Sequence, residues 1–300
     1  MLRVAYHPIY KYPLPEGHRF PMEKYELLPQ QLLYEGTCTP DNFFEPEIPN
    51  DKYLVAVHEP EYYYDLVNIK IPPREARKIG FPLTEALVER ERIIADGTMK
   101  CCEFALEHGI SLNIAGGTHH AYTNRGEAFC LLNDQAIGAR YLKAKNKIGQ
   151  ILIVDLDVHQ GNGTAQIFQN DASVFTFSMH GESNYPFTKE KSDLDIALRK
   201  GTGDQEYLAI LKKVLPKLIE DVKPDFIFYL CGVDVLATDK LGTLTLSLEG
   251  CQKRDEFVLK SCKNVQIPVQ CSMGGGYSPD IKTIVEAHAN TFRIAQTTYF

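Results

Sequence analysis

The sequence predicts an α/β protein with a mostly parallel central sheet and helices on both of its faces. Strand-like and helix-like segments alternate from about residue 84 onward, which favours parallel pairing through crossover helices. The clearest strand, Ile151–Val154, is a continuous apolar run, typical of a strand buried on both faces. Because the 300 residues show no internal repeat and no linker, we interpret residues 1–300 as a single domain.

Helical spacing of apolar residues predicts a helix at several places along the chain. Thr84–His108 ends at a glycine, a common helix stop. A capping box at 202–205 opens a helix that reaches about Asp221, with a kink at Pro216. Ser278 is the expected N-cap of the last helix, with Pro279 at its first position. The other expected helices are Met22–Leu33, Asp134–Leu142 and Ser247–Lys263.

Short runs rich in β-branched and aromatic residues predict the strands between these helices. The expected strands are Leu112–Ala115, Ile151–Val154, Val174–Phe177, Phe226–Leu230 and Val269–Ser272. The Pro- and Tyr-rich first 80 residues predict mainly loops of the same domain.

Composition narrows the class of function. The net charge is −7 and the basic residues are scattered, which argues against direct nucleic-acid binding. No run approaches the ~18 apolar residues of a membrane helix, and residues 1–7 hold no signal-like segment, so we expect a cytoplasmic protein without a membrane partner. The eight cysteines form no C-x-x-C pair, so we expect them reduced and mostly buried.

Four polar clusters each follow directly on a predicted strand: 116–121, 155–163, 232–234 and 274–277. In open α/β sheets, ligands bind beyond the carboxyl ends of the strands, so these loops should converge. Taken singly, each cluster also has a plain structural interpretation: a surface histidine pair, a loop-capping aspartate group, a turn-forming aspartate or a Gly-rich turn. Four unrelated structural explanations at four equivalent strand ends are harder to accept than one shared site.

The residue types in these clusters suit a catalytic metal site with acid–base groups. Strand alternation puts Asp155, Asp157 and His159 on one side, where a carboxylate and an imidazole can share a metal ion, and Asp234 could complete three ligands with an open fourth position. Histidines such as His119 and His120 suit acid–base work. The hydroxyl of Tyr277 could donate to a developing oxyanion.

The order GGTHHA, FCLLND, DLDVHQGNG, GVD and GGGY resembles the zinc-dependent histone deacetylase superfamily, which has the arginase/deacetylase fold. The sequence looks most like the class IV branch and its bacterial relatives. The resemblance implies one catalytic Zn²⁺ bound by Asp157, His159 and Asp234. It implies that His119 and His120 are tandem catalytic histidines, partnered by Asp155 and Asn162, and that Tyr277 is the transition-state tyrosine.

The resemblance also implies a substrate channel and structural cations. Phe129, Tyr185 and Gly275 should line the channel. A K⁺ or Na⁺ site should use backbone oxygens of Asp155, Asp157 and His159 with Ser178 and Met179, and a second site should involve Phe168, Asp171 and Val174. The implied activity is removal of acetyl or longer acyl groups from lysine side chains of proteins, with acetylpolyamines or other small acylated amines as the alternative substrates.

Three departures from the class I pattern bear on substrate recognition. Asn162 stands where class I has aspartate, so His120 should be less basic. Lys24 stands where class I has an arginine near the channel foot, and Ile79–Pro82 replaces the region of the substrate-gripping rim aspartate.

The rival functions are an arginase-like enzyme with two manganese ions and a non-catalytic acyl-lysine binding module. The oligomeric state is left open.

Overall fold

The structure is a computed structural model that describes residues 1–145 and 148–300. Its described residues build one eight-stranded sheet in the order β2-β1-β3-β8-β7-β4-β5-β6, and every pairing is parallel. The strands are β1 (Arg3–Ala5), β2 (Phe43–Phe44), β3 (Ile110–Asn113), β4 (Ile151–Asp155), β5 (Val174–Gly181), β6 (Leu194–Leu198), β7 (Phe226–Leu230) and β8 (Val269–Ser272). The α/β class with a parallel central sheet is therefore confirmed.

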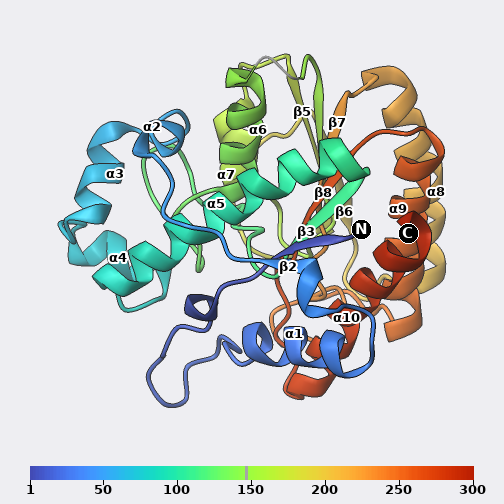
Figure 1. Cartoon of the computed structure of the whole chain (residues 1–300), viewed down its shortest axis with the longest axis horizontal. Helices are drawn as coiled ribbons and strands as arrows, with labels where there is room; N and C mark the ends of the chain where they lie inside the picture. Colours follow the sequence, from blue (N-terminus) through green and yellow to red (C-terminus); the bar gives the residue numbers. More distant parts are fainter. Residues whose placement is uncertain (146–147) are drawn as a thin grey trace.

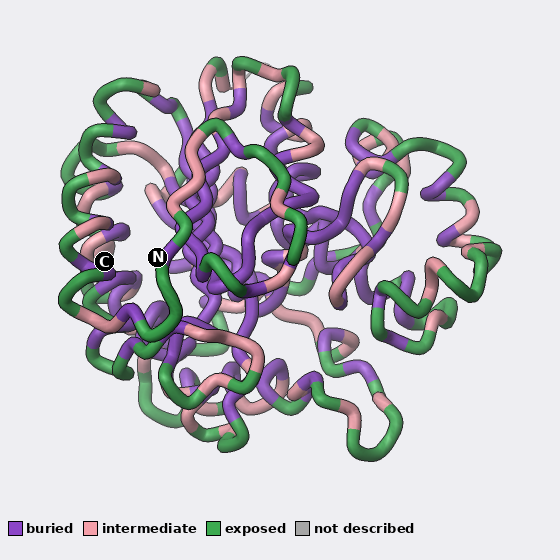
Figure 2. Tube along the Cα trace, turned by 180° about the vertical axis from the view of Figure 1, so that it is seen from behind, coloured by how far each residue is buried: buried purple, intermediate pink, exposed green. Residues whose placement is uncertain are grey.

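Helices cover both faces of the sheet. Figure 1 shows α5 and α6 on one side and α8, α9 and α10 on the other. The helices are α1 (Lys24–Tyr34), α2 (Asp51–Leu54), α3 (Pro60–Val67), α4 (Pro73–Ile79), α5 (Glu85–His108), α6 (Asp134–Ala144), α7 (Asn162–Phe168), α8 (Asp204–Val222), α9 (Leu248–Asn264) and α10 (Ile281–Tyr299), with short 3-10 turns at Pro8–Tyr10 and Pro40–Asn42. Burial is concentrated along the strands between these layers (Figure 2).

The long α5 shows how local sequence sets an element. The Thr84 side chain accepts a hydrogen bond from Leu87 N at the N-terminus, and Gly109 closes the C-terminus at φ 88°. A left-handed residue at this point favours glycine, so the predicted stop is confirmed. The buried strands β4 and β7 are apolar on both faces, as expected for a sheet covered twice.

Two predicted helix starts are wrong. Ser278 does not cap α10, because its Oγ bonds Thr238 Oγ1, and Asp280 caps the helix by accepting from Lys282 N. The capping box at 202–205 does not form. Gly203 is the N-cap of α8 without a side-chain bond, and the Asp204 carboxylate instead accepts hydrogen bonds from Ser247 at the start of α9.

Several other elements differ from the sequence-based expectation. Strand β3 ends at Asn113 and not at Ala115. The short strands β1, β2 and β6 and the helices α2, α3, α4 and α7 were not expected. All eight cysteines are free and buried, as predicted. None of the helices in the described ranges is both long and apolar enough to cross a membrane.

Candidate active site

The four polar clusters follow four adjacent strands. In the sheet, β3, β8, β7 and β4 are neighbours, and the register sets Asp155 beside Leu230 and Asn113 beside Ser272. Because parallel strands end at one edge, the loops after them meet there. Asp157, His159 and Asp234 come together as a result, with one ligand atom from each within 4.8 Å of the others.

These three side chains are arranged like metal ligands. His159 Nδ1 lies 3.0 Å from Asp157 Oδ1 and 3.1 Å from Asp234 Oδ2, and all three residues are buried. Backbone N–H groups hold the carboxylates from outside: Gly275 N donates to Asp157 Oδ2 at 2.9 Å and Val158 N donates to Asp234 Oδ1 at 2.9 Å. Two buried carboxylates side by side are costly without a cation. The Asp–His–Asp donor set fits zinc in a catalytic site.

The close packing of these buried groups also shifts the pKa values of Asp234 and His159. Burial, and then the charge of Asp157, raises the pKa of Asp234 to about 7. Burial alone would lower the pKa of His159, but its hydrogen bonds to Asp157 and Asp234 raise it to about 10. A cation bound between these three side chains would displace the proton that His159 shares with Asp157 and Asp234. In residues 1–145 and 148–300 no second group of three or more His, Cys, Asp and Glu side chains is close enough to share an ion.

Glycines let the backbone approach these ligands. A Cβ on Gly275 would lie 2.0 Å from Asp234 Oδ2, and one on Gly232 would lie 2.2 Å from Asp157 Oδ2. Any side chain at either position would therefore displace a carboxylate. The GVD and GGGY motifs thus have a steric requirement as well as a chemical one.

The tandem histidines each contact a different partner. His119 Nδ1 lies 2.6 Å from Asp155 Oδ2, and His120 Nδ1 lies 2.6 Å from Asn162 Oδ1. The two rings are 4.1 Å apart. Their loop is anchored by Asp134, whose Oδ1 accepts hydrogen bonds from Gly117 N and Thr118 N.

The hydrogen-bond directions define the tautomer of His120. Tyr122 donates its hydroxyl hydrogen to Glu190 and accepts from Asn162 Nδ2, so Asn162 Oδ1 is the atom that faces His120. His120 Nδ1–H then donates, and Nε2 keeps a free lone pair. Burial, and then the charges of His119 and His159, holds the pKa of His120 well below its usual range.

His119 has the opposite electrostatic setting. Burial alone would lower the pKa of its ring, but the charge and hydrogen bond of Asp155 raise it above the usual value. The neighbouring imidazoles therefore differ in basicity. One is suited to carry a proton and the other to be neutral, an arrangement typical of paired acid–base groups.

The carboxylate of Asp239 holds the backbone of Tyr277 in place. Asp239 Oδ2 accepts from Tyr277 N at 2.6 Å, while its Oδ1 accepts from Leu241 N and Gly242 N. Burial, and then the charges of Asp234 and Asp157, raises the pKa of the Tyr277 hydroxyl well above its usual value. The hydroxyl is therefore protonated and can donate a hydrogen bond.

Lys24 lies behind the Gly274–Gly276 turn. Its Nζ donates to Gly274 O at 3.2 Å, and the side chain is fully buried. Burial lowers the pKa of Lys24 to about 8, against the charges of Asp234 and Asp157. This contact places the lysine of α1 next to the loop that carries Tyr277.

Aromatic residues enclose the site. Phe129 and Gly275 line a cavity of about 40 Å³ together with the histidines and Tyr277. Tyr185 is not among the lining residues, but its ring packs edge-on against His120 at 5.0 Å. Ser178 lies beside Asp155 in the β4–β5 register.

Sequence reasoning missed the residue that ties two of these loops together. Arg254 on α9 is fully buried, pairs with Asp255, and donates to Gly232 O at 2.6 Å and to Leu156 O at 3.2 Å. These carbonyls belong to the loops after β7 and β4. A signal was present: Arg254 and Asp255 lie on the same helical face as Cys251 and Val258, which are buried.

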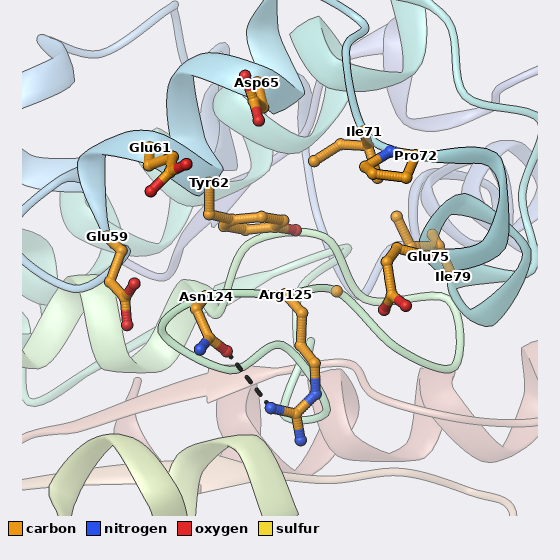
Figure 3. Close-up of a pocket in the computed structure, with 11 residues that line it drawn as sticks. Glu59, Glu61, Tyr62, Asp65, Ile71, Pro72, Glu75, Ile79, Asn124 and Arg125 are labelled. Atoms are coloured by element: carbon orange, nitrogen blue, oxygen red, sulfur yellow. Dashed lines mark hydrogen bonds between the residues drawn. The ribbon is translucent and has the colours of Figure 1, made fainter.

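A separate hollow, of about 360 Å³, is lined by side chains from residues 59–79 and 124–126. Figure 3 shows Arg125 bonded to Asn124, with acidic side chains around the hollow. The carboxylates that line it are Glu59, Glu61, Asp65 and Glu75. It contains none of the expected site residues.

Comparisons with known proteins find a family model, several relatives and a solved structure that the chain resembles. The family model of the histone deacetylase domain matches residues 18–292. The chain is 45% identical to an uncharacterised protein of Picosynechococcus sp. over 99% of both chains. It is 29% identical to histone deacetylase 2 of Arabidopsis thaliana, over 87% of this chain and 70% of that one.

Two matches of lower identity are a human protein and a solved structure. Human histone deacetylase 1 is 26% identical over 88% of this chain, which spans 58% of the human protein. The crystal structure of the HDA15 HD domain has the same fold, with a TM-score of 0.80 at 19% identity, covering 96% of this chain and 89% of that one.

Proposed function

The chain belongs to the histone deacetylase family, and from this premise we propose that it hydrolyses acyl-lysine amides with one zinc ion held by Asp157, His159 and Asp234. One observation carries the proposal. His119, His120, Asp157, His159 and Tyr277 all line the same cavity. A metal-ligand group, two imidazoles of different basicity and a protonated tyrosine are the parts that amide hydrolysis requires.

The metal and the second histidine have separate tasks. A zinc ion bound there would polarise the acyl carbonyl and lower the pKa of a water molecule. His120 is neutral, with Nδ1–H donating to Asn162 and a bare Nε2. Nε2 accepts the proton of the attacking water and later delivers a proton to the leaving amine.

His119 and Tyr277 stabilise the negative charge that develops on the substrate during the reaction. The Asp155 carboxylate favours the protonated form of His119, which supports negative charge developing nearby. The Tyr277 hydroxyl donates to the acyl oxygen as it becomes an oxyanion. Asp239 holds the Tyr277 backbone in place for this task.

The substrate class is tested by a turnover screen of purified, zinc-loaded protein. The substrates are one peptide carrying acetyl-, butyryl- or octanoyl-lysine, and acetylated polyamines. Acyl-lysine turnover well above polyamine turnover supports the proposal. Turnover of polyamines alone would assign the chain to the small-amine branch of the same chemistry, and no turnover of any amide would refute it.

Three further proposals accompany this function. A structural K⁺ or Na⁺ would bind at Asp155, Asp157, His159, Ser178 and Met179, supported by the pairing of Asp155 with Ser178. Residues 1–300 act as one catalytic domain, and the protein works in the cytoplasm on proteins or small acylated amines.

A further inference from the structure

Two cavities meet at Phe20 and Tyr277. The first, of about 40 Å³, is lined by Asp157, His159 and the tandem histidines His119 and His120. The second, of about 800 Å³, lies between the irregular segment 11–23 and the turn at 277–281. Phe20 and Tyr277 are the only two residues that line both among the described ranges. The segment 11–23 is the dark blue loop at the lower left of Figure 1.

The Phe20 ring fills the space between these cavities. It packs edge-on against Phe129 at 5.1 Å, Phe81 at 5.0 Å and Tyr277 at 5.8 Å. The Lys24 ammonium lies 5.1 Å from the centre of the ring. The ring therefore forms part of the wall beside the tyrosine that faces the reacting carbonyl.

His18 sets the position of Phe20 in an otherwise irregular segment. Its Nδ1 accepts from Phe20 N at 3.1 Å, and its Nε2 lies 2.9 Å from Gly80 O. Nε2–H is therefore the donor to the carbonyl. One imidazole thus links the segment to the residue after α4, and Phe20 is held without any helix or strand of its own.

The cavity sizes limit what can be bound with Phe20 in this position. At roughly 10–15 Å³ for each water, 40 Å³ has room for a few water molecules. An acyl tail several carbons long does not fit there. The second cavity is within the size range of small-molecule sites, roughly 300–1,000 Å³, and it offers apolar side chains such as Leu14, Met22 and Ile281.

We propose that Phe20 is a specificity-determining residue that limits the length of the acyl group, by closing the metal-site cavity off from the cavity under segment 11–23. The inference rests on the proposed acyl-lysine hydrolysis and names the residue that sets its acyl preference. Removing the ring joins the two cavities beside Tyr277, so an aliphatic acyl tail of several carbons can pass into the larger one.

The test compares kcat/KM for acetyl-lysine and octanoyl-lysine in the same peptide, for wild type, Phe20→Ala and Phe104→Ala. Phe104 is a matched control, because its ring packs on Phe44 and lines neither cavity. We expect Phe20→Ala to raise the octanoyl/acetyl ratio by at least about 10-fold, the scale on which apolar pockets discriminate chain length. Phe104→Ala should leave the ratio at the wild-type value. A ratio in Phe20→Ala within twofold of wild type overturns the proposal.

Binding separates this proposal from the proposed function. Isothermal titration with acetohydroxamate and octanohydroxamate on zinc-loaded protein reports the acyl-length preference even where turnover is absent. If wild type hydrolyses no amide, the proposed function fails. A rise of at least about 10-fold in relative octanohydroxamate affinity in Phe20→Ala still supports the proposed role of Phe20 in limiting acyl length. Should Phe20→Ala not fold, Phe20→Leu takes its place. A Phe20→Leu ratio equal to wild type in both assays overturns the proposal.

Discussion

Asn162 Oδ1 lies 2.6 Å from His120 Nδ1, and both residues are buried. The contact gives His120 a neutral partner, whereas His119 next to it contacts the carboxylate of Asp155. Because a neutral amide stabilises an imidazolium less than a carboxylate does, the two histidines are held in different protonation states.

Asn162→Asp should therefore change the pH dependence of turnover. In wild type the pKa of His120 lies well below its ordinary value, so this base is already neutral at pH 6.5. A carboxylate beside Nδ1 favours the protonated form and raises that pKa, so the acid limb of the kcat/KM profile should move to higher pH by about 1–3 units. Asn68→Asp, at an exposed position after α3, is the control and should leave the profile in place. An unmoved acid limb in Asn162→Asp would remove His120 from the role of base.

Tyr277→Phe should lower kcat more than it raises KM. The hydroxyl contacts the acyl oxygen mainly in the transition state, and loss of a comparable donor costs on the order of 10²–10³ in rate. Folding and zinc content should survive, because the ring and the Gly274–Gly276 turn are kept. Tyr34→Phe removes a hydroxyl from a side chain that is 95% exposed and should have no effect. Wild-type turnover in Tyr277→Phe would mean that the tyrosine only packs against its neighbours.

A hydroxamate should inhibit at low concentration. It can chelate a zinc ion at the open positions of the Asp157–His159–Asp234 group while meeting Tyr277 and the histidines. The carboxamide of the same chain, which chelates poorly, is the control compound. Steady-state inhibition constants for the pair provide the measurement, and equal, weak inhibition by both would argue against an accessible catalytic zinc.

Arg254→Met should destabilise the fold strongly. The change leaves the buried Asp255 without its counterion and removes the donor to the carbonyls of Leu156 and Gly232. Breaking a buried ion pair typically costs about 3–5 kcal/mol. Arg199→Met removes an 81%-exposed partner of Glu206 and should cost about 0–1 kcal/mol. Urea unfolding gives both free energies, and equal losses in the two variants would contradict the structural role given to Arg254.

The parts of the site that were predictable are local in sequence. The apolar run Ile151–Val154 followed by alternating polar residues signals a buried strand that ends in ligands, and parallel pairing then brings such ends together. The same logic located the loops after β3, β7 and β8. Errors of two positions, such as Ser278 for Asp280, arise because both residues are good helix caps and only tertiary contacts choose between them.

The unpredicted parts depend on contacts across the fold. Asp134 anchors the histidine loop and also accepts from Ser272 Oγ, which is 138 positions away in sequence. Edge strands such as β6 are only partly buried and carry a weak apolar pattern. The position of Phe20 depends on His18 and Gly80, in a segment where no helix or strand periodicity exists to be read.

If one zinc ion makes this chain an acyl-lysine hydrolase, its activity should follow the amount of bound metal, which a zinc titration of catalysis measures. Metal-free protein is titrated with Zn²⁺ while acetate release from an acetyl-lysine peptide is recorded, with Asp234→Asn in parallel. We predict that activity rises in proportion to added zinc, reaches its plateau at one equivalent per chain, and is absent in Asp234→Asn. Activity that needs two equivalents, or no acetate release at any zinc level, would contradict the account.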